Sequence, residues 1–382
     1  MTAPTPRLHR GPRALDGLAT LPAVRDAREV AILCGASSLA AGGWLYDVRG
    51  ALGADRVVVY DGLGREPAPA DLVPVVAWLR ARPVDVVVAI GGGSVLDVGK
   101  AAAFLVRRGG HDGFLACVPK AAPAPLSLVA VPTTAGTGAE VTPFATFWDR
   151  ADAVKRSLDD PAVVPDDVVL DPRLTLSLPP RLSALSGIDA FTHACEAFWN
   201  RRHTPETDSV ALAAVALLGR HLAAVVADGS DLAARAAVQE GALLAGLAIA
   251  QTRTAACHAI SYPLTLRHRV PHGQAVAVTL PAVLLLNAAA CEDGLDGDAL
   301  AAAEQRRRDF CAALDVRSID DAAAAVHALL ERCGLSTRLG PLGVAAADLD
   351  ALVAEGQDPR RMCNNPHTFS PDGLHALLRR LL

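Results

Sequence analysis

The first 180 residues alternate between strand-like and helical segments, and this alternation restricts the fold more than any other feature of the sequence. The strand-like segments are short runs of mostly β-branched residues, the pattern of parallel strands that are buried on both faces. They lie at residues 29–35, 55–62, 84–93, 126–134 and 166–172. Helical stretches separate several of them, for example at 66–82 and 95–107. This order predicts an α/β domain built on a doubly wound parallel sheet.

The sequence changes character after about residue 180. Strand-like runs disappear, and long segments rich in alanine and leucine repeat apolar residues at helical spacing: 181–200, 204–228, 230–250, 274–292, 297–314, 318–333 and 346–356. We therefore predict two domains, an α/β domain over residues 1–180 and an all-α domain over residues 181–382.

The composition excludes several classes of protein. With 51% hydrophobic residues, the chain can bury enough apolar surface to fold, which excludes disorder. Its 36 basic and 41 acidic residues give a net charge of −5, so no basic surface for nucleic acid is expected. The first residues lack the apolar stretch of a signal peptide, and the longest apolar runs fall short of a ~20-residue membrane span or contain proline. We expect a cytoplasmic protein that binds neither nucleic acid nor membranes.

A glycine-rich turn between a strand and a helix is the first motif with chemical meaning. Residues 91–94, Gly-Gly-Gly-Ser, follow the strand-like run at 84–93 and precede a helix. Glycines let the backbone approach a ligand, and the free N–H groups of a helix start favour an anion such as a pyrophosphate. Ser94 and Asp97 have the spacing of a helix cap and its partner. A turn that binds nothing is the alternative, because the ordinary G-x-G-x-x-G fingerprint is absent.

A second turn, rich in threonine and glycine, follows the next strand. Thr133, Thr134 and Thr137 supply hydroxyl groups, and Gly136 and Gly138 keep the backbone accessible. Such a turn can hold a phosphate or the edge of a ribose, although many surface turns of this composition bind nothing.

Four residues of the helical half have side chains that suit a metal. Asp189 and His193 are four residues apart, on one face of a predicted helix, and His258 and His272 follow farther along the chain. One carboxylate and three imidazoles form a plausible ligand set for Fe²⁺ or Zn²⁺. Single histidines more often serve in the core or on the surface, so these residues alone leave the metal site open.

The motifs in this order resemble the iron-containing (group III) alcohol dehydrogenase superfamily. They are GGGSxxDxxK, PTTAGTGAEVT, GIDAFTHACEAF and the two later histidines, and the resemblance spans about residues 25–300. It implies the fold shared with dehydroquinate synthase, with a dinucleotide-binding domain followed by a helical domain. It places the pyrophosphate on residues 91–94 and sets Thr133 and Thr134 beside the adenine and ribose. It assigns the metal to Asp189, His193, His258 and His272.

Position 262 departs from the superfamily pattern, because many members carry a histidine there, close to the substrate. Tyr262 stands in its place. A tyrosine can donate a hydrogen bond to the substrate, but its ordinary pKa of ~10 makes it a poor proton shuttle at neutral pH. Tyr262 is therefore a candidate catalytic residue without the usual relay.

The segment 252–273, together with Asn364-Asn365-Pro366, resembles the phosphonoacetaldehyde reductase branch of this superfamily. A phosphonate aldehyde is a small dianion, and guanidinium groups match its oxygens with charge-assisted hydrogen bonds. Arg253 and Arg267 are the candidate residues for this contact. Alternatively, residues 267–269 form a solvated basic loop.

The residues after the first buried strand bear on the choice of dinucleotide. NAD-selective members tend to carry an aspartate there that binds the ribose 2′-hydroxyl, whereas this chain has Gly35, Ala36, Ser37 and Ser38. The missing carboxylate removes a repulsion against a 2′-phosphate, so NADPH is the expected cofactor, with NADH as the alternative. Ser37 and Lys155 complete the expected cofactor-binding residues.

Together these features predict a metal-dependent oxidoreductase, expected as a homodimer, that reduces phosphonoacetaldehyde to 2-hydroxyethylphosphonate in the biosynthesis of phosphonate antibiotics. The main alternative is a general alcohol dehydrogenase or aldehyde reductase with a neutral substrate. A cyclase similar to dehydroquinate synthase and a binding protein with an inactive site remain open as well.

Overall fold

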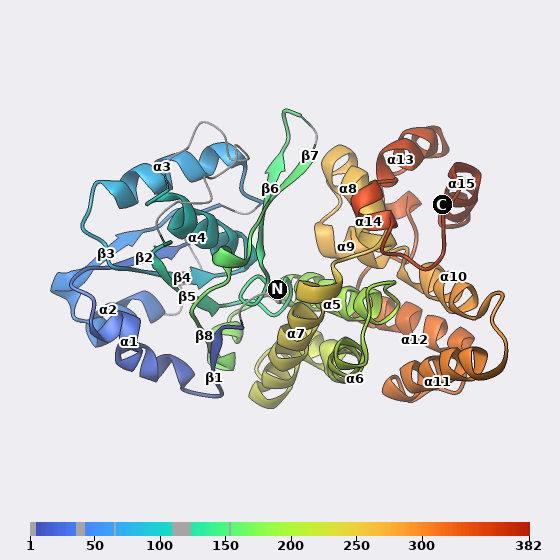
Figure 1. The fold of residues 1–382 in the computed structure, drawn as a ribbon, viewed down its shortest axis with the longest axis horizontal. Coiled ribbons are helices and arrows are strands. Elements are labelled where there is room, and N and C mark those ends of the chain that lie inside the picture. Colours follow the sequence, from blue (N-terminus) through green and yellow to red (C-terminus); the bar gives the residue numbers. More distant parts are fainter. Residues whose placement is uncertain (1–4, 36–42, 65, 109–123, 153) are drawn as a thin grey trace. The chain divides into compact units, whose positions relative to one another are not determined.

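The computed structural model describes residues 5–35, 43–64, 66–108, 124–152 and 154–382. The chain divides into two compact units, Met1–Ser177 and Leu178–Leu382, where the sequence analysis expects a boundary at residue 180. The first unit is an α/β structure and the second is helical (Figure 1), so the predicted fold class is confirmed.

The first unit is built on a parallel sheet. Among its described residues, six strands pair in the order β1-β8-β5-β4-β2-β3. All residues of β2 and β4 are buried, which explains why these strands are apolar on both faces. The strands are β1 (Arg7–Arg10), β2 (Val30–Cys34), β3 (Val57–Tyr60), β4 (Val86–Gly91), β5 (Ser127–Pro132) and β8 (Asp167–Leu170). From β2 the chain runs outward to β3 and then returns to β4 on the other side of β2, so the winding direction reverses between β2 and β4.

Helices cover both faces of this sheet. Figure 1 shows α3 and α4 on one face and α1 and α2 on the other. The helices are α1 (Pro22–Arg25), α2 (Trp44–Leu52), α3 (Pro69–Arg80) and α4 (Gly93–Leu105). Short 3₁₀ helices accompany them at Ala14–Thr20, Ala54–Arg56, Pro161–Val163 and Pro172–Thr175.

Three strands of the first unit were not predicted. β1 is a polar segment at the edge of the sheet, where Arg7 and His9 both contact the buried carboxylate of Asp167. β6 (Phe144–Asp149) and β7 (Val154–Asp159) form a separate antiparallel hairpin. Edge strands and hairpins expose part of their surface, so they lack the continuous apolar run that identifies a central strand.

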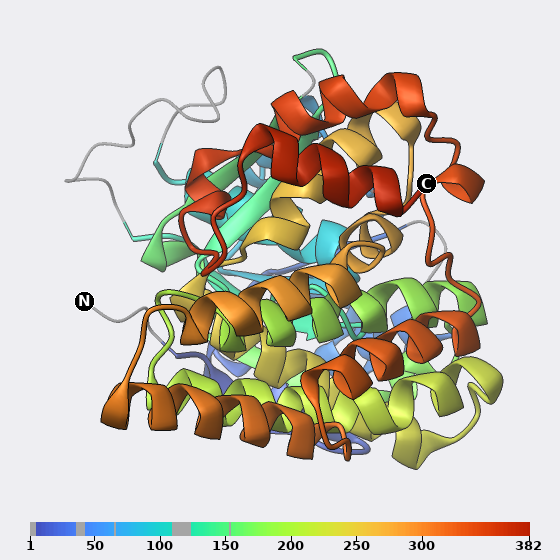
Figure 2. The ribbon, with the colours of Figure 1, turned by 90° about the vertical axis from the view of Figure 1, so that its right-hand side faces the viewer.

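The second unit is organised around α5, which packs against α6, α7 and α9. In Figure 2 the later helices, drawn in orange and red, lie nearer the viewer than the green α5. The helices are α5 (Pro180–Phe198), α6 (Pro205–Ala227), α7 (Leu232–Thr252), α8 (Ala256–His268), α9 (His272–Ala277), α10 (Leu280–Glu292), α11 (Gly297–Ala313), α12 (Ile319–Arg332), α13 (Leu349–Gly356), α14 (Pro359–Met362) and α15 (Pro371–Arg380). Short 3₁₀ helices lie at Gly340–Leu342 and Ala346–Asp348.

The helical prediction differs from the structure in two ways. The single helix expected over 274–292 is two helices, α9 and α10, separated by Val278 and Thr279. The helices α8, α14 and α15 were not predicted. In α8 an internal proline, Pro263, and several polar residues interrupt the regular apolar spacing.

The helices α6 and α7 correct one expectation from the sequence. They are 23 and 21 residues long with mean hydropathies of 2.0 and 1.3 in their most apolar windows, so by length and composition they are long enough to cross a membrane. Both pack against each other and against α5. The apolar window of α7 is 61% buried and that of α6 33% buried, so packing in this unit accounts for most of the apolar residues of α7 and for one face of α6.

Candidate active site

The helix α5 supplies the first two residues of the predicted metal site. From Gly187 to Phe198 every residue is buried, because this segment lies at the centre of the helical unit. Asp189 and His193 are one turn apart and share a face, as their spacing predicts. Asp189 Oδ1 lies 3.8 Å from His193 Nε2.

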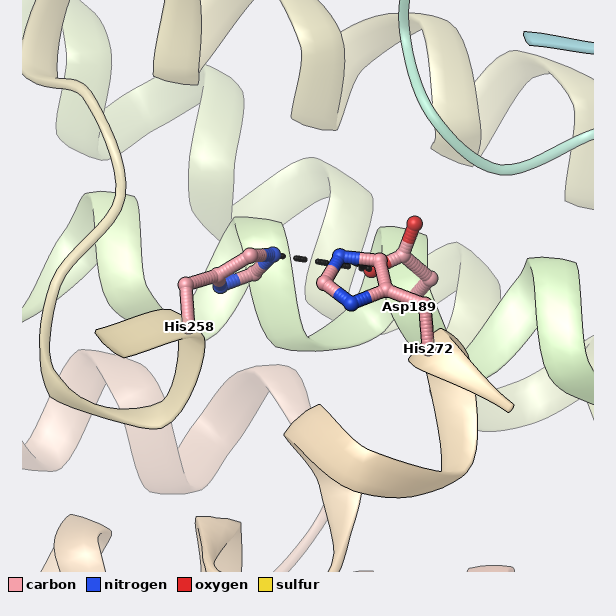
Figure 3. A group of neighbouring side chains, drawn as sticks. All are labelled: Asp189, His258 and His272. Atoms are coloured by element: carbon pink, nitrogen blue, oxygen red, sulfur yellow. Dashed lines mark ion pairs between the residues drawn. The ribbon is translucent and has the colours of Figure 1, made fainter. Parts of the chain in front are cut away.

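Two other helices bring the remaining histidines to the same carboxylate oxygen. His258 lies in the first turn of α8, with its Nε2 3.5 Å from Asp189 Oδ1. His272 is the first residue of α9, with its Nε2 3.9 Å from the same oxygen. Figure 3 shows Asp189, His258 and His272 converging, and the His193 and His258 rings stack with their centroids 4.6 Å apart. The structure therefore brings all three histidines to within 4 Å of one carboxylate oxygen, and the ligand atoms of Asp189, His258 and His272 all lie within 4.8 Å of one another.

The arrangement fits a divalent metal ion. Among the described residues, the buried atoms Asp189 Oδ1 and His258 Nε2 have no hydrogen-bond partner. A buried carboxylate oxygen without a hydrogen-bond partner destabilises the folded protein unless a cation lies beside it. Ligand atoms about 2.1 Å from one ion lie roughly 3–4 Å from each other, and the three distances to Asp189 Oδ1 fall in this range.

The charges around Asp189 also favour a cation. Burial alone would raise the pKa of Asp189, but His193, His258 and His272 outweigh burial and hold this pKa well below its usual value. Burial alone would lower the pKa of His258, yet Glu196 and Asp189 raise it to about 9. The site therefore keeps its carboxylates ionised, and positive charge is stabilised beside them.

Glu196 belongs to this site, and the sequence analysis did not identify it. The side chain is buried on α5, and Oε2 accepts hydrogen bonds from His258 Nδ1 at 2.7 Å and from the Ala255 backbone N–H at 2.8 Å. Because a carboxylate can only accept from Nδ1, the ring presents an unprotonated Nε2 towards Asp189 when His258 is neutral. The only signal in the sequence is its position three residues after His193, one turn along the same helix.

Replacing Glu196 by glutamine is expected to weaken metal binding 10- to 100-fold, because the amide keeps the shape of the side chain but loses the charge that orients and polarises His258. Competition between the protein and a chromophoric chelator for Co²⁺ measures this affinity. Glu331→Gln is the matched control, since Glu331 is an exposed residue of α12. Equal Co²⁺ affinities in E196Q and the parent would contradict this role.

The start of α9 packs directly on the backbone of α5. A Cβ atom added at Gly273 would lie 2.0 Å from the carbonyl oxygen of Leu185. Only glycine permits this approach, and the neighbouring residue is His272. The close contact therefore brings His272 within reach of Asp189.

In the first unit, the two glycine-containing turns lie against each other. Gly91 ends β4 and Gly93 begins α4, while the second turn follows β5, the neighbouring strand. A Cβ at Gly93 would lie 2.5 Å from the side chain of Thr137, and a Cβ at Gly92 would lie 3.1 Å from that of Thr134. The Thr133 backbone N–H donates to the Gly91 carbonyl at 2.9 Å. These turns lie at the carboxyl ends of the strands, next to the reversal between β2 and β4, where doubly wound sheets bind dinucleotides.

The predicted capping pair of Ser94 and Asp97 is wrong. The helix α4 begins at Gly93, so Gly92 is its N-cap residue and no side chain caps it. Ser94 Oγ instead accepts from the Glu66 backbone N–H, and Asp97 accepts from the Thr146 backbone N–H at 3.0 Å. Burial raises the pKa of Asp97 to about 6. Ser94 and Asp97 remain beside the turn, which leaves their predicted contact with a cofactor as a prediction.

Lys100 is the lysine of the GGGSxxDxxK motif, and the sequence analysis assigned it no role. Its buried Nζ donates to the carbonyl oxygens of Ala139 and Phe144 and to Thr142 Oγ1, at 2.7, 2.5 and 3.2 Å. It thereby fixes the segment that follows the second turn. Of the other predicted cofactor residues, Lys155 lies over the Trp148 ring, and Ser37 is outside the described residues.

The three predicted substrate residues have different surroundings. The ring of Tyr262 stacks with that of His272, with centroids 6.5 Å apart, at the edge of the metal site. Arg253 is the C-cap residue of α7, with a positive φ of 67°, and is half-buried. Arg267 is exposed and paired with Glu355. Because this carboxylate already neutralises its charge, Arg267 is a weaker candidate for holding a dianion than its sequence position indicates.

The Asn-Asn-Pro segment ties the end of the helical unit to this site. Asn364 Nδ2 donates to the Thr254 carbonyl at 2.8 Å, in the turn that leads to His258. Asn365 and Asn287 form a buried pair in which each amide donates to the other, at 2.7 and 3.0 Å. Arg201 donates to the carbonyls of Asn365 and Pro366.

Comparison with known proteins gives consistent matches over both units. Residues 4–172 match the family model described as iron-containing alcohol dehydrogenase, and residues 183–382 match the C-terminal model of the Fe-containing alcohol dehydrogenase family. The chain is 41% identical to phosphonoacetaldehyde reductase of Streptomyces viridochromogenes over 84% of this chain and 82% of the relative. It is 33% identical to long-chain-alcohol dehydrogenase 1 of Geobacillus thermodenitrificans, over 80% and 77% of the two chains. The structure of sulfoacetaldehyde reductase from Bifidobacterium kashiwanohense in complex with NAD⁺ superposes with a TM-score of 0.89 at 28% identity, over 100% of this chain and 98% of that one.

Proposed function

The chain belongs to the iron-containing alcohol dehydrogenase family, and from this premise we propose that it reduces phosphonoacetaldehyde to 2-hydroxyethylphosphonate with NADPH. The observation that carries the reaction class is the convergence of three histidine Nε2 atoms on Asp189 Oδ1. The similarity to a phosphonoacetaldehyde reductase supports the substrate and a setting in phosphonate biosynthesis.

We propose that Asp189, His193, His258 and His272 hold iron, with zinc as the alternative, and that the turns at 91–94 and 133–137 hold the dinucleotide. A divalent ion polarises an aldehyde carbonyl and a reduced nicotinamide supplies hydride, which is the chemistry that these groups contribute when bound. The NAD⁺ complex of the sulfoacetaldehyde reductase supports a nicotinamide cofactor. The absence of a carboxylate at residues 35–38 supports NADPH over NADH.

The residues around the ligands define what the chain itself contributes. Glu196 accepts a hydrogen bond from His258 Nδ1, which leaves His258 Nε2 unprotonated and able to bind a metal ion. Tyr262, beside His272, accepts a hydrogen bond from Arg361, and a hydroxyl that accepts one hydrogen bond can donate another to a substrate oxygen. We propose that Tyr262 orients the aldehyde, and that the proton for the product alcohol comes from another group.

A general reductase of neutral aldehydes is the second candidate, supported by the similarity to a long-chain-alcohol dehydrogenase. The two candidates differ in the part of the substrate that does not react. A phosphonate needs a cationic contact near the metal site, whereas a long-chain aldehyde needs an apolar one.

The test compares phosphonoacetaldehyde with butyraldehyde on the iron-reconstituted protein, using NADPH and then NADH. We expect kcat/KM to be at least about tenfold higher for phosphonoacetaldehyde, because desolvated charge pairs contribute several kcal/mol to binding. We also expect NADPH to be oxidised faster than NADH. A higher kcat/KM for butyraldehyde selects the second candidate, and no turnover of either aldehyde by metal-loaded protein refutes both.

A further inference from the structure

The turn between α7 and α8 has a strained backbone. Residues 253–255 connect the end of α7 at Thr252 with the start of α8 at Ala256, and His258 lies in the first turn of α8. Arg253 has φ 67° and ψ 176°. Only glycine adopts this combination readily, so another residue persists in it only where its surroundings hold it there, and such residues gather at functional sites. The chain therefore enters the helix of His258 through a conformation that needs support.

Two buried amide side chains supply this support. Asn200, two residues beyond the end of α5, and Asn364, two residues beyond the end of α14, have exposed fractions of 1% and 4%. Asn200 Nδ2 donates to the Arg253 carbonyl at 3.1 Å, and Asn364 Nδ2 donates to the Thr254 carbonyl at 2.8 Å. If Arg253 relaxed to a negative φ, both carbonyls would turn away from these amides, and buried hydrogen bonds would be lost. The two amides therefore favour the strained conformation.

One peptide group of the turn connects Asn364 with the metal site. The Thr254 carbonyl and the Ala255 N–H belong to this group, and the N–H donates to Glu196 Oε2 at 2.8 Å. The same oxygen accepts from His258 Nδ1 at 2.7 Å, and the His258 backbone N–H donates to Glu196 Oε1 at 3.2 Å. A chain of hydrogen bonds therefore runs from Asn364 through the peptide group and Glu196 to the His258 ring. In a buried chain of this kind each bond polarises the next.

We propose that Asn364 is a positioning residue for the metal site: it holds the turn at 253–255 in its strained conformation and thereby keeps Glu196 and His258 aligned. Asn200 acts on the same turn at the preceding peptide group. This inference rests on the proposed metal site. It gives the Asn-Asn-Pro segment a role in metal binding, whereas the sequence analysis connects that segment only with a branch of the superfamily.

The first test is Asn364→Ala in the full chain, titrated with Co²⁺ alone. We expect the Co²⁺ affinity to fall about tenfold or more, because the partners that orient a metal-binding histidine have effects of this size. The visible absorption of bound Co²⁺ should also change, since it depends on the arrangement of the ligands. Competition with a chromophoric chelator measures the affinity, and circular dichroism establishes that the variant is folded.

The second test asks whether Asn364 acts through the strained turn. Arg253→Gly and Arg253→Ala both remove the side chain, but only glycine adopts a φ of 67° without strain. The double variant N364A/R253G should therefore bind Co²⁺ several-fold more tightly than N364A/R253A. A residue that only stabilised the fold would not be rescued in this way.

The same two substitutions in the parent give a test that does not require N364A to fold. R253G is expected to unfold at a higher urea concentration than R253A, because glycine removes the strain and alanine keeps it. Within a helix or strand the order is the reverse, since alanine is ordinarily the more stable of the two.

Ser318→Ala is the control for a general loss of stability. Ser318 Oγ accepts from the Asp321 backbone N–H at 3.1 Å and caps α12. S318A should unfold at a lower urea concentration than the parent but keep the Co²⁺ affinity and the spectrum of the parent.

Three results would overturn the inference alone: a folded N364A protein with the Co²⁺ affinity and spectrum of the parent, equal Co²⁺ affinities in the two double variants, or an R253G protein that is no more stable than R253A. If His258→Ala leaves the Co²⁺ affinity of the parent unchanged, the proposed metal site is refuted, and the inference with it. The two failures are therefore distinguishable.

Discussion

Replacement of His258 by alanine is expected to remove the bound metal and to lower turnover more than about 100-fold. His258 Nε2 is 3.5 Å from Asp189 Oδ1, and losing a direct ligand should cost at least as much as the 10–100-fold loss that follows removal of a supporting residue. The substitution also leaves Glu196 buried without the imidazole that accounts for much of its low pKa. Elemental analysis of protein reconstituted with Fe²⁺ under anaerobic conditions, together with NADPH oxidation, measures both losses.

His327→Ala is the control for this experiment, because His327 is an exposed histidine of α12. Its Nδ1 lies 3.6 Å from Oε1 of Glu331 on the same helix. It should retain the full iron content and turnover. If H258A and the parent contain equal amounts of iron, the assignment of the metal to this cluster is refuted.

Replacement of Gly273 by alanine is expected to destabilise the helical unit and to weaken metal binding at the same time. The added Cβ would lie 2.0 Å from the Leu185 carbonyl oxygen and 2.8 Å from its carbon, and these backbone atoms belong to the central helix α5. The start of α9 must therefore move away from α5, and His272 moves with it, away from Asp189. We expect a loss of about 1–3 kcal/mol in the free energy of unfolding, the usual range for overpacking, and at least tenfold weaker Co²⁺ binding.

Chemical unfolding of the metal-free protein measures the first effect, and competition with a chelator measures the second. Gly50→Ala is the matched control, since Gly50 lies in α2 with no atom within 4 Å of an added Cβ. That substitution should be neutral or stabilise the protein by about 0.5–1 kcal/mol, because alanine is the better helix former. A G273A protein with the stability and Co²⁺ affinity of the parent would show that α9 does not need this close approach.

The central strands β2 and β4 are the clearest of the elements that could be predicted, because they are buried on both faces. Every residue of β2 and β4 is buried, so their sequences are short continuous apolar runs, and such runs indicate a buried strand. β1 and the β6–β7 hairpin mix charged and apolar residues, and such segments resemble loops when only the sequence is known. The helix α8 was missed because it contains Pro263, and a proline usually interrupts a helix.

The four proposed metal ligands were assigned through the resemblance to the superfamily, because their residue types and spacing alone left the metal site open. Glu196 was not assigned, because its role depends on His258, a partner 62 residues away in the sequence. The error at Ser94 and Asp97 has a local cause: the helix begins at Gly93, two residues earlier than a cap at Ser94 requires.

The division of the chain after Ser177 has a consequence for how enzymes of this kind diversify. Asp189 and Tyr262, with the other proposed ligands, all belong to Leu178–Leu382, whereas both glycine-containing turns belong to Met1–Ser177. Under the proposed function, the residues that select the aldehyde and those that bind the reductant are encoded in separate, contiguous stretches of the gene. On these assignments, we expect a crossover between related genes near codon 177 to exchange the substrate preference and keep the cofactor preference, so that a lineage acquires a new substrate without rebuilding its nucleotide site.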